Sequence, residues 1–118
     1  MKDLTKIVCF IVCITSVLSC GGKISKSWTV EDFSQTHVFT IDVADNKNVS
    51  NANVYMEGKF TGHVILQKDQ NSPFIKFSQD SIPSNLFFDF YGGQFDIYLI
   101  ESDANGELKI TIEIPYHP

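Results

Sequence analysis

The sequence predicts an all-β domain: an antiparallel β-sandwich of the immunoglobulin type or similar, with about seven or eight strands, following a cleaved signal peptide. Three observations support this. Apolar and polar residues alternate in short runs, turn residues separate the runs at hairpin spacing, and no stretch has a helical period. The expected strands are residues 27–30, 38–43, 53–57, 62–68, 74–78, 86–91, 94–101 and 108–115. Short strands at this density are typical of a sandwich or a small barrel.

Turn residues also predict how the last three strands pair. Gly92 and Gly93 suit a two-residue turn with positive φ, and a second turn is expected at Asn105 and Gly106. The resulting meander would pair Phe90 with Phe95, Phe88 with Ile97, Leu86 with Leu99, Leu99 with Ile112 and Ile97 with Ile114. All these apolar residues would share one face. The opposite face would carry Phe87, Tyr98, Ile100, Lys109, Thr111 and Glu113.

The same register would place Asp89 directly opposite Asp96. Opposed like charges destabilise a sheet, so solvent, a nearby lysine or a bound calcium ion would have to compensate. A second calcium hypothesis concerns residues 103–107, which partly resemble the start of a calcium-binding loop. A complete loop would need a bidentate glutamate at position 112, which is an isoleucine here, and the hairpin turn already explains Asn105 and Gly106.

The chain begins with a segment typical of secretion signals. Lys2 and Lys6 precede an apolar run from Ile7 to Leu18. As a helix this run would span about 18 Å, well short of the roughly 30 Å hydrocarbon core of a bilayer. The segment is therefore interpreted as a signal peptide over residues 1–19.

The signal peptide ends in Val17, Leu18, Ser19 and Cys20, and this order resembles the lipobox of bacterial lipoproteins. The resemblance implies acylation of the Cys20 thiol and cleavage before it, with the membrane as a partner. Two or more acyl chains anchor a protein stably. As a whole the chain resembles small β-sandwich lipoproteins of Bacteroidota-type bacteria, without a specific family for the mature domain. The expected location is the cell envelope, at the outer membrane and facing the periplasm.

Three segments are predicted: the signal peptide (1–19), the lipidated cysteine with a short polar tether (20–27), and the sandwich (28–118). The three cysteines, Cys9, Cys13 and Cys20, all lie in the signal or at its cleavage point. The mature domain is therefore expected to fold without disulfides and to hold no thiolate metal site.

Charge argues against a nucleic acid partner. Loss of Lys2, Lys6 and Asp3 with the signal reduces 9 basic and 14 acidic residues to 7 and 13, a formal charge of −6. Arginine is absent, so the chain lacks the guanidinium groups that bind phosphate bidentately.

No catalytic motif, cofactor site or metal site is predicted. His37, His63 and His117 lie on separate segments without paired ligands, and no serine has the flanking glycines of a nucleophile elbow. The chain is therefore interpreted as a non-enzyme without a cofactor. A short match, Asp80-Ser81-Ile82, resembles an O-glycosylation signal of Bacteroidota and marks Ser81 as a candidate modification site.

The residues proposed for partner contact are Trp28, Tyr98, Asp89 and Asp96, because aromatic rings dominate interfaces and the paired acids would face outward. The predicted function is a membrane-anchored, non-catalytic binding or structural module of the envelope. Two alternatives stay open: an inhibitor or immunity protein that covers a toxin or enzyme, and a glycan-binding module with exposed aromatic rings.

Overall fold

The computed structural model describes residues 22–44 and 47–117; the expected signal peptide (1–19) and Cys20 lie outside them. The described part contains nine strands and one short 3₁₀ helix. They are β1 (Lys23–Val30), β2 (His37–Val43), β3 (Asn48–Val49), β4 (Asn51–Thr61), β5 (Val64–Gln67), β6 (Ile75–Phe77), η2 (Gln79–Ser81), β7 (Leu86–Asp89), β8 (Gly93–Ile100) and β9 (Asn105–His117). No helix in this part of the chain is long and apolar enough to cross a membrane.

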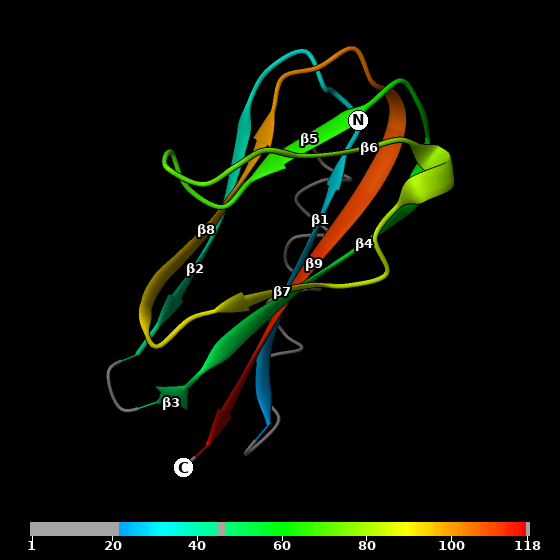
Figure 1. Cartoon of the computed structure of the whole chain (residues 1–118). Helices are drawn as coiled ribbons and strands as arrows, with labels where there is room; N and C mark the ends of the chain where they lie inside the picture. Colours follow the sequence, from blue (N-terminus) through cyan, green and yellow to red (C-terminus); the bar gives the residue numbers. More distant parts are fainter. Residues whose placement is uncertain (1–21, 45–46, 118) are drawn as a thin grey trace, which may run out of the picture.

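The strands form two antiparallel sheets that pack face to face (Figure 1). One sheet has the order β1-β9-β4-β7, with β3 paired to the end of β9, and the other has the order β2-β8-β5-β6. Every connection crosses between the sheets except β3–β4 and β5–β6. The predicted antiparallel sandwich is confirmed, and its strand order is that of a jelly roll, not that of an immunoglobulin domain.

Apolar side chains from both sheets fill the space between them. The largest fully buried ones are Phe95, Ile41, Leu66, Ile97, Leu99, Leu108, Ile110, Ile112, Ile114, Val54 and Val64. They recur at every second position because successive side chains of a strand point to opposite faces. Burying each of them contributes about 1.5–3 kcal/mol, so this two-sided core stabilises the domain.

Each of the eight predicted segments overlaps one observed strand, with ends that differ by a few residues. The ninth strand, β3, is only two residues long, too short for alternation to reveal it. A larger difference concerns the predicted tether. β1 begins at Lys23, and Ile24 pairs with Ile114, so residues 23–27 belong to the sheet and the domain starts earlier than residue 28.

The predicted meander of the last three strands is wrong. β7 pairs with β4, β8 pairs with β2 and β5, and β9 pairs with β1 and β4, so successive strands lie in opposite sheets. The predicted apolar face is nevertheless buried: Phe88 and Phe90 pack against Phe95 across the sandwich, with ring centroids 5.9 and 5.3 Å apart. The alternation of apolar residues specifies which side of a strand is buried. This pattern is the same whether the strand's sequence neighbour pairs with it in one sheet or packs against it across the core.

The second predicted turn, at Asn105 and Gly106, lies inside a strand. Both residues already belong to β9, where they pair with Thr61 and Phe60, and the chain reverses in residues 101–104 instead. Gly106 is required by a close approach: a Cβ there would lie 2.3 Å from the Lys59 carbonyl oxygen, and its φ is 136°. The glycine therefore serves strand packing, not a hairpin.

Candidate binding face

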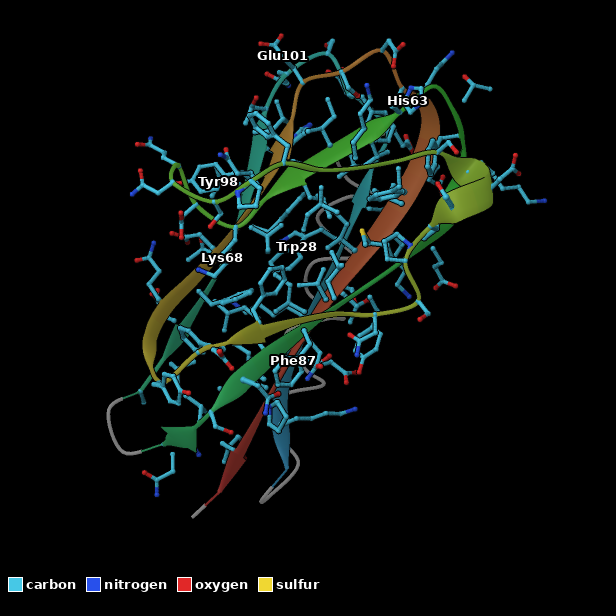
Figure 2. All side chains as sticks on the ribbon, in the orientation of Figure 1. Trp28, His63, Lys68, Phe87, Tyr98 and Glu101 are labelled. Carbon is cyan, nitrogen blue, oxygen red and sulfur yellow. The ribbon has the colours of Figure 1, made fainter. Side chains whose placement is uncertain are left out.

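The four residues proposed for partner contact are distributed over both sheets. Trp28 on β1 is half-buried between the sheets, with its ring centroid 5.0 Å from that of Phe39 (Figure 2). Asp89 is exposed at the end of β7, whereas Asp96 and Tyr98 are half-buried on β8. Of these four residues, the structure therefore brings together only Asp96 and Tyr98, on one strand face, whereas Trp28 is partly buried and packs against the core.

The predicted opposition of Asp89 and Asp96 is wrong, because their strands belong to different sheets. Asp89 pairs with Asn51, and Asp96 pairs with Thr40. The Thr40 hydroxyl donates to Asp96 Oδ1 at 2.7 Å, and Gln94 Nε2 lies 3.0 and 3.2 Å from the two carboxylate oxygens. Asp96 is thus stabilised by neighbouring donors, and the calcium hypothesis for this pair loses its basis.

The loop proposed as a second calcium site has a structural role. Asp103 Oδ1 accepts a hydrogen bond from the His63 backbone N–H at 3.1 Å, which links the β8–β9 connection to the β4–β5 turn. Among the described residues, no group of three or more histidine, cysteine, aspartate or glutamate side chains is arranged to hold a metal ion.

The remaining sequence candidates lie apart from one another. His37 Nε2 lies 2.7 Å from the carbonyl oxygen of Asp32, and His63 is exposed. The side chain of His117 lies outside the described residues. Ser81 is exposed at the end of η2, where its hydroxyl accepts a hydrogen bond from the Ser78 backbone N–H.

The outer side of the β2-β8-β5-β6 sheet carries adjacent apolar and amphipathic side chains. In one row Val38, Tyr98 and Gln67 are neighbours in register, and in the next Ile100, Ile65 and Lys76 are neighbours. Val38 is 51% exposed. Phe74, one residue before β6, is 62% exposed, and alternation places it on the same side as Lys76. We refer to Val38, Tyr98, Gln67, Ile65, Ile100 and Phe74 as the Tyr98 face. In Figure 2 Tyr98 lies on the side of β8 away from Trp28.

Sequence reasoning identified Tyr98 and Ile100 on this face but not Val38, Ile65 or Phe74. The signal was present in β2, where Phe39, Ile41 and Val43 point inward and leave Val38 outward. What the sequence could not provide was the order β2-β8-β5, which places these residues side by side.

The outer side of the other sheet is mainly polar and internally paired. Lys23 Nζ lies 3.1 Å from Glu113, the Ser27 and Thr111 hydroxyls are 2.8 Å apart, and Lys109 lies 3.9 Å from Glu57. Its exposed aromatic residues are Phe87 at 61% and Tyr55 at 36%. Three pairs of polar side chains on this side therefore contact one another, and its two exposed rings lie on β7 and β4.

An open depression lies at the end of β4, lined by Lys59, Phe60, Thr61, Gln79 and Asn105. The Gln79 side chain accepts a hydrogen bond from the Phe60 N–H at 2.7 Å and donates to the Gly58 carbonyl at 2.9 Å. Its amide therefore extends the sheet along β4 beyond the end of β7. Gln79, the lining residue that η2 contributes, therefore has a structural role in the sheet.

The carboxyl of Asp69, in the β5–β6 loop, has a lowered pKa. Hydrogen bonds from the Asn71 backbone N–H and then the Ser72 hydroxyl lower the pKa of this carboxyl. Asp69 is fully exposed, so the effect is local to the loop.

Comparison with known proteins yields structural likenesses only. No protein-family model matches the chain, and neither does any curated protein. A predicted oxalate decarboxylase from Thermotoga maritima is similar at 10% identity and a TM-score of 0.46, over 80% of this chain and 67% of that one. A cupin domain from Bordetella pertussis is similar at 12% and 0.44, over 86% and 88%. The Aeromonas hydrophila periplasmic inhibitor of g-type lysozyme is similar at 15% and 0.42, over 78% and 83%. At identities this low and TM-scores below 0.5, none of these similarities indicates a function for this chain.

Proposed function

We propose that this chain is a lipid-anchored envelope protein whose jelly roll is a non-catalytic module that binds another protein through the Tyr98 face. The observation that carries the proposal is the outward row of Val38, Tyr98 and Gln67, with Val38 51% exposed and Tyr98 only half-buried. Neighbouring Ile65, Ile100 and Phe74 extend the apolar surface. Exposed apolar residues grouped in this way are typical of protein interaction sites.

The shape of the site favours a protein partner over a small molecule. Small ligands are usually held in concave pockets that bury most of their surface. The interior of this sandwich is filled by its own side chains, and the Tyr98 face is one side of a sheet. Such a surface, with a tyrosine at its centre and polar residues around it, resembles the apolar core and polar rim of protein interfaces.

Charge indicates the chemistry of the partner. On β8, Asp96 and Gln94 follow Tyr98 toward the turn, and Asp42 on β2 pairs with Gln94, so acids border the apolar rows on that side. The mature chain carries a formal charge of −6. Charge complementarity therefore favours a partner with an apolar patch and a basic border. An enzyme or toxin held by an inhibitor would be one such partner.

Photo-crosslinking tests this proposal directly. A photoreactive phenylalanine analogue at position 98 should give one discrete protein adduct in intact envelopes, and the adduct should disappear in a second variant, Val38→Asp. The same analogue at position 87 is the matched control, because Phe87 is an exposed aromatic residue of the other sheet. Equal adducts from both positions, or an adduct that survives Val38→Asp, would refute binding at the Tyr98 face.

The anchoring part of the proposal rests on the lipobox at residues 17–20. Cys20→Ala should move the protein from the membrane fraction to the soluble fraction, or leave it unprocessed. Cys13→Ala, which changes a cysteine inside the apolar run, should have no such effect. A Cys20→Ala chain that is still processed to the mature size and still stays with the membrane would count against lipidation at this residue.

A glycan partner is the second candidate, and a specific observation favours it. Phe87, 61% exposed, pairs in register with Asn53, and Tyr55 lies two residues further along β4. Aromatic rings beside amide groups can stack on sugars and bond to their hydroxyls. On this alternative, binding to insoluble polysaccharide or peptidoglycan would be lost in Phe87→Ala and kept in Tyr98→Ala, the reverse of the protein-binding prediction.

A further inference from the structure

We propose that the end of the domain where β1 begins rests on the lipid headgroups, with Tyr91 in the headgroup layer, so that the Tyr98 face stands clear of the bilayer. This inference rests on the proposed lipidation of Cys20. It goes further by fixing how the domain is oriented on the membrane and which residues touch the lipid.

The anchor has a short reach. The Tyr116 N–H donates to the Gly22 carbonyl at 2.9 Å, so the chain is already held to β9 two residues after Cys20. Two residues span at most about 7 Å. A cysteine whose acyl chains lie in the bilayer would therefore keep this end of the sandwich within about one headgroup layer of the surface.

The β7–β8 turn lies at the same end of the molecule as the anchored chain. β3 pairs with Tyr116 and His117 at the end of β9, and the Phe90 N–H donates to the carbonyl of Ser50, which follows β3. These contacts connect the anchored strand to the turn step by step, and Figure 1 shows the start of β1, β3 and the turn toward one end of the molecule. Tyr91 is the next residue after Phe90.

The side chains at this end suit a headgroup layer. Tyr91 is 76% exposed although Phe90 beside it is buried, and Gly92 and Gly93 follow with φ of 137° and 83°. Tyrosine is enriched where proteins meet lipid headgroups, because its ring is apolar and its hydroxyl is polar. Lys47 Nζ lies 4.1 Å from the centroid of the Tyr116 ring, which adds a cation at the same end.

The opposite end of the molecule is acidic. The loops there, residues 31–36, 62–63 and 101–104, contain Glu31, Asp32, Glu101 and Asp103 and no lysine. Anionic lipids would repel this end. The anchored end has carboxylates too, Asp42 and Asp89, but it also carries Lys47, so the lysine-free end is the less suited of the two to anionic headgroups.

The orientation leaves the Tyr98 face accessible. β8 runs from Gly93 at the turn to Tyr98 five residues further on, a distance of about 17 Å along the strand. The headgroup region of one leaflet is only about 5–8 Å thick. The residues proposed to contact the partner would therefore lie above it.

Tryptophan quenching by the membrane tests the orientation. The lipidated full-length mature protein is reconstituted into phosphatidylcholine vesicles that contain a lipid with a nitroxide on its headgroup. Emission is compared between Tyr91→Trp and the matched control His63→Trp, an exposed position at the opposite end, with Trp28 as the shared background. We expect several-fold stronger quenching of the added emission for Tyr91→Trp. Both positions are exposed, so neither change should disturb folding.

Equal quenching at the two positions would overturn the orientation. Flotation of the same vesicles tests the lipid anchor separately from the orientation of the domain. Protein that does not float would refute the anchor and the orientation together, whereas protein that floats with equal quenching would refute the orientation alone.

Discussion

At the scale of single residues, β8 shows how one strand serves both the core and the surface. Phe95 is fully buried and its ring packs against those of Phe88 and Phe90, while the Lys68 ammonium lies 4.9 Å from the Phe95 ring centroid. Tyr98 lies three positions further on and therefore points to the other side. Alternation in the sequence was sufficient to assign both residues to their faces.

Phe95→Ala should destabilise the domain by about 3–5 kcal/mol, because it removes a ring that fills the space between the sheets. Phe87→Ala, the same change at a residue that is 61% exposed, should alter stability by no more than about 0.5 kcal/mol. Denaturant unfolding of both variants measures the difference. Similar losses would contradict the assignment of Phe95 to the core.

Asp69 provides a prediction about pH. Its pKa is lowered by hydrogen bonds that the carboxylate accepts within the β5–β6 loop. A depressed folded-state pKa contributes stability that is present above the unfolded pKa and is lost as the pH falls through the folded pKa. An NMR titration of the side-chain carboxyl should therefore show a midpoint below the usual range for aspartate. A midpoint at or above that range would mean that the loop hydrogen bonds do not form.

At the scale of elements, strands could be predicted from sequence but their partners could not. The eight expected segments all contain strands, because the alternation of apolar residues is a local property. Pairing depends on contacts far apart in the chain. The two glycines at positions 92 and 93 permit a hairpin, yet here they join strands of opposite sheets. For the same reason Asp89 and Asp96 were expected to meet and do not.

A comparison of two glycines with nearly equal φ distinguishes the cost of backbone strain from that of steric crowding. Gly106 has φ of 136° and a Cβ there would lie 2.3 Å from the Lys59 carbonyl oxygen, whereas Gly92 has φ of 137° and nothing within 4 Å of such a Cβ. Gly106→Ala should therefore cost about 1–3 kcal/mol more than Gly92→Ala, since only it forces β4 and β9 apart. Denaturant unfolding measures both. Equal costs would mean that crowding at the β4–β9 pairing contributes nothing.

At the scale of the whole molecule, composition and periodicity predicted an all-β sandwich, and the structure adds the jelly-roll order. That order decides the candidate site, because it makes β2, β8 and β5 neighbours and so places Val38 and Ile65 beside the strand of Tyr98. Tyr98 and Ile100, the part of the site that lies on β8, could be predicted from the alternation within that one strand. The role of Trp28 was not, because a single tryptophan in a short polar strand can face either side.

We propose that the jelly roll is held to the membrane at Cys20, with little free chain between the lipid and β1. Intact-mass analysis of the protein purified from envelopes tests it most directly. We predict a chain that starts at Cys20 and carries a diacylglycerol group with its acyl chains. A chain that starts at another residue, or an unmodified Cys20, would contradict the claim.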